Sequence, residues 1–261
     1  MITMDAALTI DAELDELERT LGVRVLYAAE SGSRAWGFAS PDSDYDARFI
    51  YARPVADYLK LEDTRDTIEW KLDEVLDISG WDLAKFMRLM RRSNPSVFEW
   101  LASPVIYRER LSFAQVRGLA PQCFSVVSIS HHYLHMARNN AHEFLAGEKV
   151  SLKKYLYVVR ALLAARWSIR RQSPAPMLFS ELMAAELEPE MHPLLTLMLE
   201  EKQRAGEKTP HTRIPELDAW IANAFTEVES AVQELHRAAK PSWGVLDAAF
   251  MKVLEDEGLM G

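Results

Sequence analysis

The hydrophobic pattern of this 261-residue chain changes its period along the sequence, and this change constrains the fold more than any other feature. In the first third, several short segments alternate apolar and polar residues, so that every second residue is apolar, which is typical of strands. From about residue 112 to 256, apolar residues recur every three to four positions, which is typical of helices. These patterns predict an α+β fold with a small mixed-sheet head and a C-terminal helical domain. We place the predicted domains at residues 1–110 and 111–261.

Within the head, the sequence predicts a helix over about residues 5–20 and then strands in VRVLYAAE and YDARFIYA. The runs TIEWKL and EVLDIS are joined by a short turn and predict a hairpin that extends the sheet. A helix follows in WDLAKFMRLMRR, with Ser79 or Asp82 as its cap, and Asn94 with Pro95 predicts the start of the next. Prolines and glycines divide the later part into five to seven helices.

The composition is that of an ordinary globular protein, with 49% hydrophobic residues. No apolar run approaches the roughly 20 residues needed to cross a bilayer, and the N-terminus does not resemble a secretory signal. Cys123 is the one cysteine, so no internal disulfide is expected. We therefore expect a cytoplasmic protein without membrane contact. The net charge of −9 argues against a uniformly basic surface, although basic residues cluster near residues 88–92 and 153–171.

The turn between the first two predicted strands has the residues best suited to chemistry. Gly32 permits close approach of a backbone, and Ser33 adds a hydroxyl, so an anion such as phosphate can bind there. Alternation along the next strand places Asp44 and Asp46 on the same face. Two adjacent carboxylates repel each other unless a cation joins them, and hard oxygen ligands of this kind suit Mg²⁺.

A third carboxylate is needed if two metal ions are to bind both the attacking and the leaving oxygen of a displacement. Asp77 is the best candidate because it lies in mid-strand between apolar neighbours, so its side chain faces the other way. Arg48 shares the face of Asp44 and Asp46. Its guanidinium can steady a metal ligand, contact a phosphate, or pair with a surface acid.

The order Gly-Ser, ten residues, Asp-Tyr-Asp resembles the signature of the DNA polymerase beta nucleotidyltransferase superfamily. The stretches ESGSRAWGFASPDSDYDARFIY, GWDLAKFMRLMRRSNPSVFEWL and LKKYLYVVRALLAARW are similar to its branch of predicted nucleotidyltransferases associated with RNA repair. The resemblance covers roughly residues 30–167. It implies that Asp44 and Asp46 bind both metal ions, that Asp77 helps to activate the acceptor hydroxyl, and that the turn at Gly32 and Ser33 contacts the β- and γ-phosphates.

The reaction implied by this resemblance uses two Mg²⁺ ions and a nucleoside triphosphate as substrate. An acceptor hydroxyl, deprotonated with help from one ion and Asp77, attacks the α-phosphorus, and pyrophosphate leaves on the other ion. The resemblance favours the end of an RNA, such as a tRNA-like molecule, as the acceptor in RNA repair.

The helix SLKKYLYVVRALLAARW is a further candidate for nucleotide binding. Resemblance to the family's helix with Lys-Lys-Tyr favours Lys153, Lys154, Tyr155 and Arg160 as residues that contact the nucleotide. The alternative is a solvent-exposed charged face, the more common location of Lys and Arg on a helix. The sequence leaves open which of the two lysines points inward.

Two other functions compete with RNA-end addition. The same chemistry can modify a protein or a small molecule, as in relatives from toxin–antitoxin pairs and antibiotic resistance, or the site can serve a nucleotide sensor without turnover. The choice of triphosphate and the oligomeric state have no signal in the sequence. His131 and His135 lie one helical turn apart, but no glutamate or cysteine completes a metal site there.

Overall fold

The computed structural model describes residues 4–145, 147, 149–205, 210–236 and 239–261. The chain forms two compact units. Unit 1 comprises residues 1–35, 44–124 and 239–261, and unit 2 comprises residues 36–43 and 125–238. These units differ from the two contiguous segments expected from the sequence, because the chain passes from one unit to the other four times. The functional division into residues 1–110 and 111–261 stays a prediction, since compactness does not assign function.

Unit 1 contains a mixed five-stranded sheet with the order β3-β4-β2-β1-β5. Its strands are β1 (Arg24–Glu30), β2 (Tyr45–Ala52), β3 (Thr67–Leu72), β4 (Leu76–Asp82) and β5 (Ile106–Glu109). Strands β2 and β4 run parallel, and the other neighbours run antiparallel. The α+β fold with a mixed sheet and the β3-β4 hairpin are therefore confirmed, whereas the short edge strand β5 was not expected.

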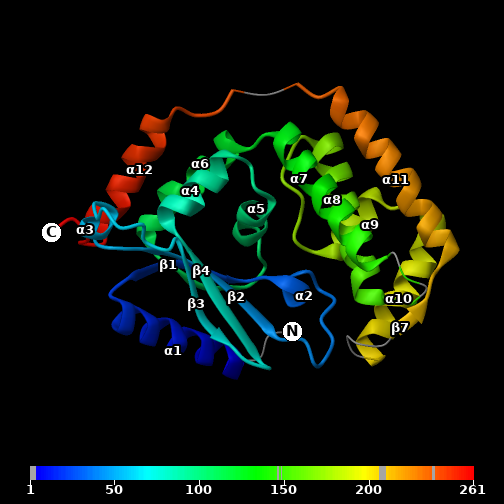
Figure 1. The fold of residues 1–261 in the computed structure, drawn as a ribbon, viewed down its shortest axis with the longest axis horizontal. Helices are drawn as coiled ribbons and strands as arrows, with labels where there is room; N and C mark the ends of the chain where they lie inside the picture. Colours follow the sequence, from blue (N-terminus) through cyan, green and yellow to red (C-terminus); the bar gives the residue numbers. More distant parts are fainter. Residues whose placement is uncertain (1–3, 146, 148, 206–209, 237–238) are drawn as a thin grey trace. The chain divides into compact units, whose positions relative to one another are not determined.

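Helix α1 (Met4–Leu21) covers one face of this sheet (Figure 1). Its buried residues Ile10, Leu14 and Leu17 belong to one apolar cluster with Ala47 and Phe49 of β2. The burial of alternate β2 residues confirms the predicted alternation. The intervening polar residues of β2 therefore face the opposite side of the sheet.

Part of that opposite side is covered by helices that form a second core, which is rich in aromatic residues. Its helices are α4 (Leu83–Arg91), α5 (Pro95–Leu101), the 3₁₀ helix η1 (Leu111–Phe113) and α6 (Ala114–Cys123). The Tyr27 ring stacks on Phe113 with 5.2 Å between centroids, and its hydroxyl donates to the Trp100 carbonyl at 2.6 Å. Asp82 caps α4 by accepting from the Ala84 amide at 2.7 Å, which resolves the predicted choice between two caps.

Two short helices and the C-terminal helix complete unit 1. The short helices are α2 (Gly32–Ala35) and α3 (Val55–Tyr58), and the C-terminal helix is α12 (Trp243–Asp256). Expected as part of the helical domain, α12 instead belongs to unit 1, where it contacts α4 and α6.

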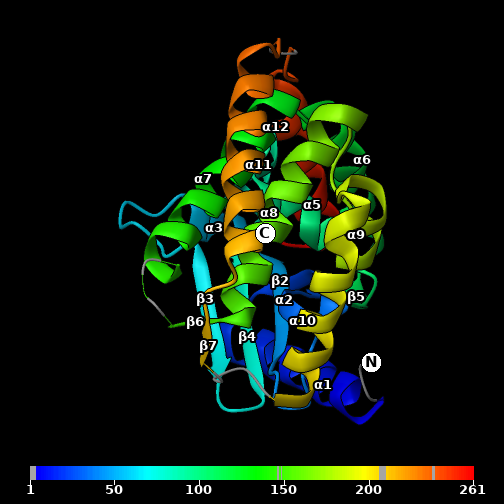
Figure 2. The ribbon, with the colours of Figure 1, turned by 90° about the vertical axis from the view of Figure 1, so that its right-hand side faces the viewer.

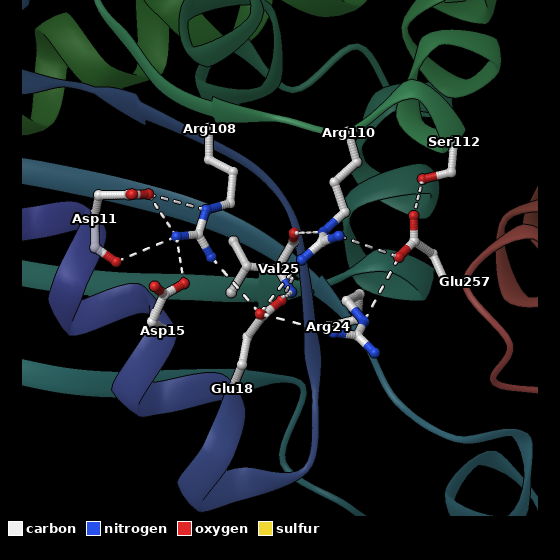
Figure 3. Close-up of polar contacts among 9 residues, drawn as sticks. All are labelled: Asp11, Asp15, Glu18, Arg24, Val25, Arg108, Arg110, Ser112 and Glu257. Carbon is white, nitrogen blue, oxygen red and sulfur yellow. Dashed lines mark hydrogen bonds and ion pairs between the residues drawn. The ribbon is translucent and has the colours of Figure 1, made fainter.

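A charged cluster in unit 1, here called the arginine network, joins segments that are distant in the sequence (Figure 3). Its members are Arg24, Arg108, Arg110, Asp11, Asp15, Glu18 and Glu257. Arg108 pairs with α1 through Asp15 at 2.7 Å, and Arg24 of β1 pairs at 3.6 Å with Glu257, directly after α12. The network thus connects α1, two strands and the end of α12.

Unit 2 is built around helix α8 (Leu152–Arg171), which packs against α7 (Val126–Phe144), α9 (Phe179–Glu186) and α11 (Pro215–Gln233) (Figure 2). The remaining elements are η2 (Pro189–Met191), α10 (His192–Ala205) and the paired strands β6 (Lys149–Ser151) and β7 (Pro210–Thr212). Seven α-helices, α6 to α12, follow residue 112 in the described ranges, so the predicted five to seven are confirmed. No helix among the described residues is long and apolar enough to span a membrane.

Candidate active site

Three aspartates predicted from the sequence converge at one place on unit 1. Asp46 of β2 lies directly opposite Asp77 of the parallel strand β4, and Asp44 immediately precedes β2. One carboxylate oxygen from each of the three lies within 4.8 Å of the other two. Among the residues that the structure describes, no other group of three or more His, Cys or acidic side chains brings ligand atoms this close together.

The Gly-Ser turn packs directly against this cluster. The Ser31 amide donates to the Asp46 carbonyl at 2.8 Å, which ties the turn to β2. Gly32 has a φ of +59°, and a Cβ placed on it would lie 1.9 Å from Oδ2 of Asp46. Both the backbone conformation and the lack of space therefore require glycine here. Ser33 follows in α2 with 3% of its surface exposed.

Arg48 supplies positive charge to two of the three aspartates. Its Nη2 lies 2.8 Å from Oδ1 of Asp46 and 2.7 Å from Oδ2 of Asp77, and its Nη1 donates to Oδ1 of Asp77 at 2.8 Å. Burial opposes the charge of the guanidinium, but the hydrogen bonds and charges of Asp77 and Asp46 raise the pKa of Arg48. These partners are the candidate metal ligands themselves, so the contact is the one expected if Arg48 steadies a metal ligand, and a contact of Arg48 with a phosphate stays a prediction. Within the described chain, no lysine or arginine pairs with the Asp44 carboxylate.

A fourth carboxylate, Glu30, lies fully buried at the end of β1. It accepts the Asp46 amide at 3.0 Å and the hydroxyl of Tyr107 from β5. Burial raises the pKa of Glu30 to about 7, although both hydrogen bonds lower it. The sequence did not single out Glu30, because a glutamate after an apolar run marks the end of a strand equally well. Glu30 holds the backbone of Asp46 in place.

Arg34 of α2 also holds the backbone beside the cluster, and sequence reasoning missed it as well. Its Nε donates to the Asp44 carbonyl at 2.9 Å, and its guanidinium lies 3.9 Å from the centroid of the Tyr45 ring. An arginine within the turn GSRAWG was the available signal. The turn therefore contacts the aspartate-bearing segment both at Asp44 and at Asp46.

Two of the residues predicted on the basic helix are buried inside unit 2. Arg160 has 3% of its surface exposed, and its guanidinium lies 4.2 Å from the centroid of the Trp36 ring. Tyr155 is fully buried, and its hydroxyl donates to Asp218 at 2.7 Å. A solvent-exposed charged face, the alternative considered for this helix, does not describe these two side chains.

The two lysines of α8 are partly exposed and lie against aromatic rings. The Lys154 ammonium is 3.4 Å from the centroid of Phe144, and that of Lys153 is 5.8 Å from the centroid of Tyr157. Binding of a nucleotide by these lysines, or by Tyr155 and Arg160, stays a prediction.

The mixed sheet, the Gly-Ser turn and the convergent aspartates agree with the resemblance to DNA polymerase beta-type nucleotidyltransferases. Residues 7–252 match the family described as the RNA repair pathway DNA polymerase beta family (RlaP). The chain is also similar to Uncharacterized protein YcgL of Bacillus subtilis (strain 168), with 39% identity over 246 residues, or 94% of this chain and 95% of that protein. The chain therefore belongs to the RNA repair pathway DNA polymerase beta family, which confirms the resemblance inferred from its motifs.

Proposed function

We propose that this protein is a Mg²⁺-dependent nucleotidyltransferase. It transfers a nucleoside monophosphate from a nucleoside triphosphate to a hydroxyl at the end of an RNA. The expected acceptor is a tRNA-like molecule in RNA repair. The observation that carries this proposal is the convergence of Asp44, Asp46 and Asp77 beside Gly32. Membership of the RNA repair pathway family supports the class of reaction and of acceptor.

The donor set of the site fits Mg²⁺. Three half-buried carboxylates with oxygens within 4.8 Å of one another supply the hard ligands that this ion prefers, and Mg²⁺ typically completes its coordination with water and substrate phosphates. Bound Mg²⁺, as two ions in the proposed reaction, would neutralise these carboxylates and stabilise the charge on the reacting oxygens. Asp44 and Asp46 are the ligands we propose for both ions, with Asp77 as the third.

For Asp77 and for the Gly-Ser turn, we propose the roles that the family resemblance implies. Asp77 accepts the proton of the acceptor hydroxyl, and the turn at Gly32 and Ser33 binds the β- and γ-phosphates of the substrate. Glu30 keeps Asp46 oriented through its backbone amide, at 3.0 Å. Arg48 limits the repulsion between Asp46 and Asp77. In unit 2, we propose the α8 residues predicted from the sequence as nucleotide contacts; these are Lys153, Lys154, Tyr155 and Arg160.

The experiment that tests this function is incubation of the purified protein with each α-labelled nucleoside triphosphate and Mg²⁺, with and without bulk cellular RNA. The matched control is the double variant Asp44→Asn with Asp46→Asn, which removes two charges and keeps the side-chain shape. We expect label on RNA from the wild type and none from the double variant. Label on the protein alone would overturn the RNA acceptor, and triphosphate binding without any transfer would favour a sensor. Undiminished transfer by the double variant would overturn the assignment of the site.

A further inference from the structure

A loop of unit 2, Trp36–Ser43, connects two parts of the candidate site. It begins directly after α2, which contains the Gly-Ser turn, and it ends directly before Asp44. The path of this loop therefore restricts where the chain can place Asp44.

The first half of the loop is held by two helices of unit 2. The Trp36 ring lies under the guanidinium of Arg160 from α8, and its carbonyl accepts the Phe179 amide of α9 at 2.9 Å. Phe38 packs edge-on against the Phe179 ring, with 5.4 Å between centroids. These contacts fix the loop where it leaves the Gly-Ser turn.

The middle of the loop is held by Lys202 of α10, whose side chain is almost fully buried. Only 2% of Lys202 is exposed. Its ammonium donates to the Phe38 carbonyl at 2.9 Å and lies 3.5 Å from the hydroxyl oxygen of Ser40. Burial of an ammonium is unfavourable, and an apolar side chain of the same length would avoid that cost. The polar groups of the loop that it binds explain why a lysine can occupy this position.

A buried serine turn continues from that contact to the aspartate. Ser40 and Ser43 are 2% and 5% exposed. The Ser43 amide donates to the Ser40 carbonyl at 3.1 Å, the Ser40 amide donates to the Ser43 hydroxyl at 3.0 Å, and the two hydroxyls lie 3.0 Å apart. Because Asp44 is the next residue, a displacement of this closed turn would displace Asp44.

We infer that Lys202 is a positioning residue for Asp44. Lys202 acts through the Trp36–Ser43 loop, so that the metal affinity of the site depends on unit 2. The inference rests on the proposed function for the statement that Asp44 binds a metal ion. Ligands that are held in place before binding lose less conformational entropy when the ion arrives. Loss of the Lys202 hydrogen bond leaves the Phe38 carbonyl unsatisfied and loosens the turn that leads to Asp44.

The test compares Lys202→Met, which keeps the length of the side chain and removes its charge, with Ser40→Ala, which removes a loop hydroxyl and leaves the lysine. Arg204→Met is the matched control, because Arg204 lies on the same helix with 80% of its side chain exposed. Electron paramagnetic resonance of free Mn²⁺ gives the dissociation constant of each variant. We expect about five- to tenfold weaker Mn²⁺ binding for Lys202→Met, a smaller change in the same direction for Ser40→Ala, and none for Arg204→Met.

Amide hydrogen exchange of the same variants provides a readout that does not need metal or activity. We expect faster exchange at Ser40 and Ser43 that extends to the amides of residues 44–46. Faster exchange confined to the loop, with unchanged Mn²⁺ affinity, would mean that Lys202 has only a structural role and would overturn the inference. If Lys202→Met does not fold, the same outcomes are read from Ser40→Ala. If the wild type binds no Mn²⁺, the proposed function fails, and exchange at residues 44–46 alone decides the positioning role.

Discussion

Unit 1 contains two clusters of acidic side chains whose charges are balanced in different ways. In the arginine network, each carboxylate contacts at least one guanidinium (Figure 3). At the candidate site, Arg48 pairs with Asp46 and Asp77, and within the described chain no cationic side chain pairs with Asp44. Each cluster contains one arginine of similar burial, since Arg108 and Arg48 have 13% and 18% of their side chains exposed.

We expect this difference to separate ion pairs that stabilise the fold from carboxylates that bind a cation, as proposed above. The network joins α1 to the strands and to the end of α12, so its ion pairs hold distant segments together. The aspartates of the site are held by strand pairing and by the turn at Gly32, which keep like charges close together in spite of their repulsion. An acidic cluster of this kind, held by the backbone and only partly neutralised, favours a cation-binding site.

The largest effect should come from Asp77→Asn, compared with Glu18→Gln in the arginine network. If Asp77 accepts the proton of the acceptor hydroxyl, its loss should lower the single-turnover rate of nucleotide transfer by about 10²- to 10⁴-fold. Affinity for the triphosphate should change far less. Glu18→Gln changes the same type of charge within the same unit and should leave the rate close to that of the wild type. Equal losses of rate in both variants would mean that the two clusters do not differ in function.

The parts of the site that the sequence predicts are those governed by local periodicity. Alternation along β2 placed Asp46 and Arg48 together on the face opposite the apolar core. Asp77 was expected in mid-strand and is the second residue of β4, but its place between buried Leu76 and Ile78 gave the direction of its side chain. The turn chemistry of Gly32 marked the right location, since this glycine has a positive φ.

The parts that the sequence did not predict depend on contacts between distant residues. Glu30 is paired with Tyr107, which lies 77 positions further along the chain, and Lys202 binds the carbonyl of Phe38 across 164 positions. Neither contact leaves a periodic signal near either partner. Strand β5 is a four-residue edge strand that contains charged residues, and it is too short for a clear alternation. The return of α12 to unit 1 likewise depends on packing, as its own periodicity indicates only a helix.

The next largest effect concerns pH and the buried Glu30. Its pKa is raised from 4.5 to about 7, so between these pH values the folded state keeps a proton that the unfolded state has released. Folding stability therefore falls as pH rises through this window, by about 3 kcal/mol in total. Glu30→Gln removes this cost. In urea unfolding with a metal chelator, the free energy of unfolding of the variant should exceed that of the wild type by up to about 3 kcal/mol at pH 8.5. At pH 5 the difference should be under about 1 kcal/mol. A difference that does not change with pH would contradict the assignment.

A smaller but more discriminating effect is expected from Arg48→Met and Arg108→Met, which remove similarly buried guanidiniums from the two clusters. Each should lower the free energy of unfolding by about 2 kcal/mol without metal, less than for a fully buried pair because the partner carboxylates are partly exposed. Saturating Mg²⁺ should restore the free energy of unfolding of Arg48→Met, since the ion replaces the missing positive charge between the aspartates. It should not restore Arg108→Met. An equal response of both variants to Mg²⁺ would remove the distinction between the clusters.

The smallest effect is expected from Lys252→Gln on α12. This variant tests whether the number of ion pairs or their burial determines how much they stabilise the fold. Lys252 pairs with Glu255 at 3.3 Å and with Asp256 at 2.6 Å, so it contacts two carboxylates as Arg48 does. Its side chain is 45% exposed, however, and water screens both pairs. We expect no measurable change in the urea midpoint at either low or high salt. A loss as large as that of Arg108→Met would mean that counting charge pairs is sufficient, and the contrast between the two acidic clusters would then have to rest on metal binding alone.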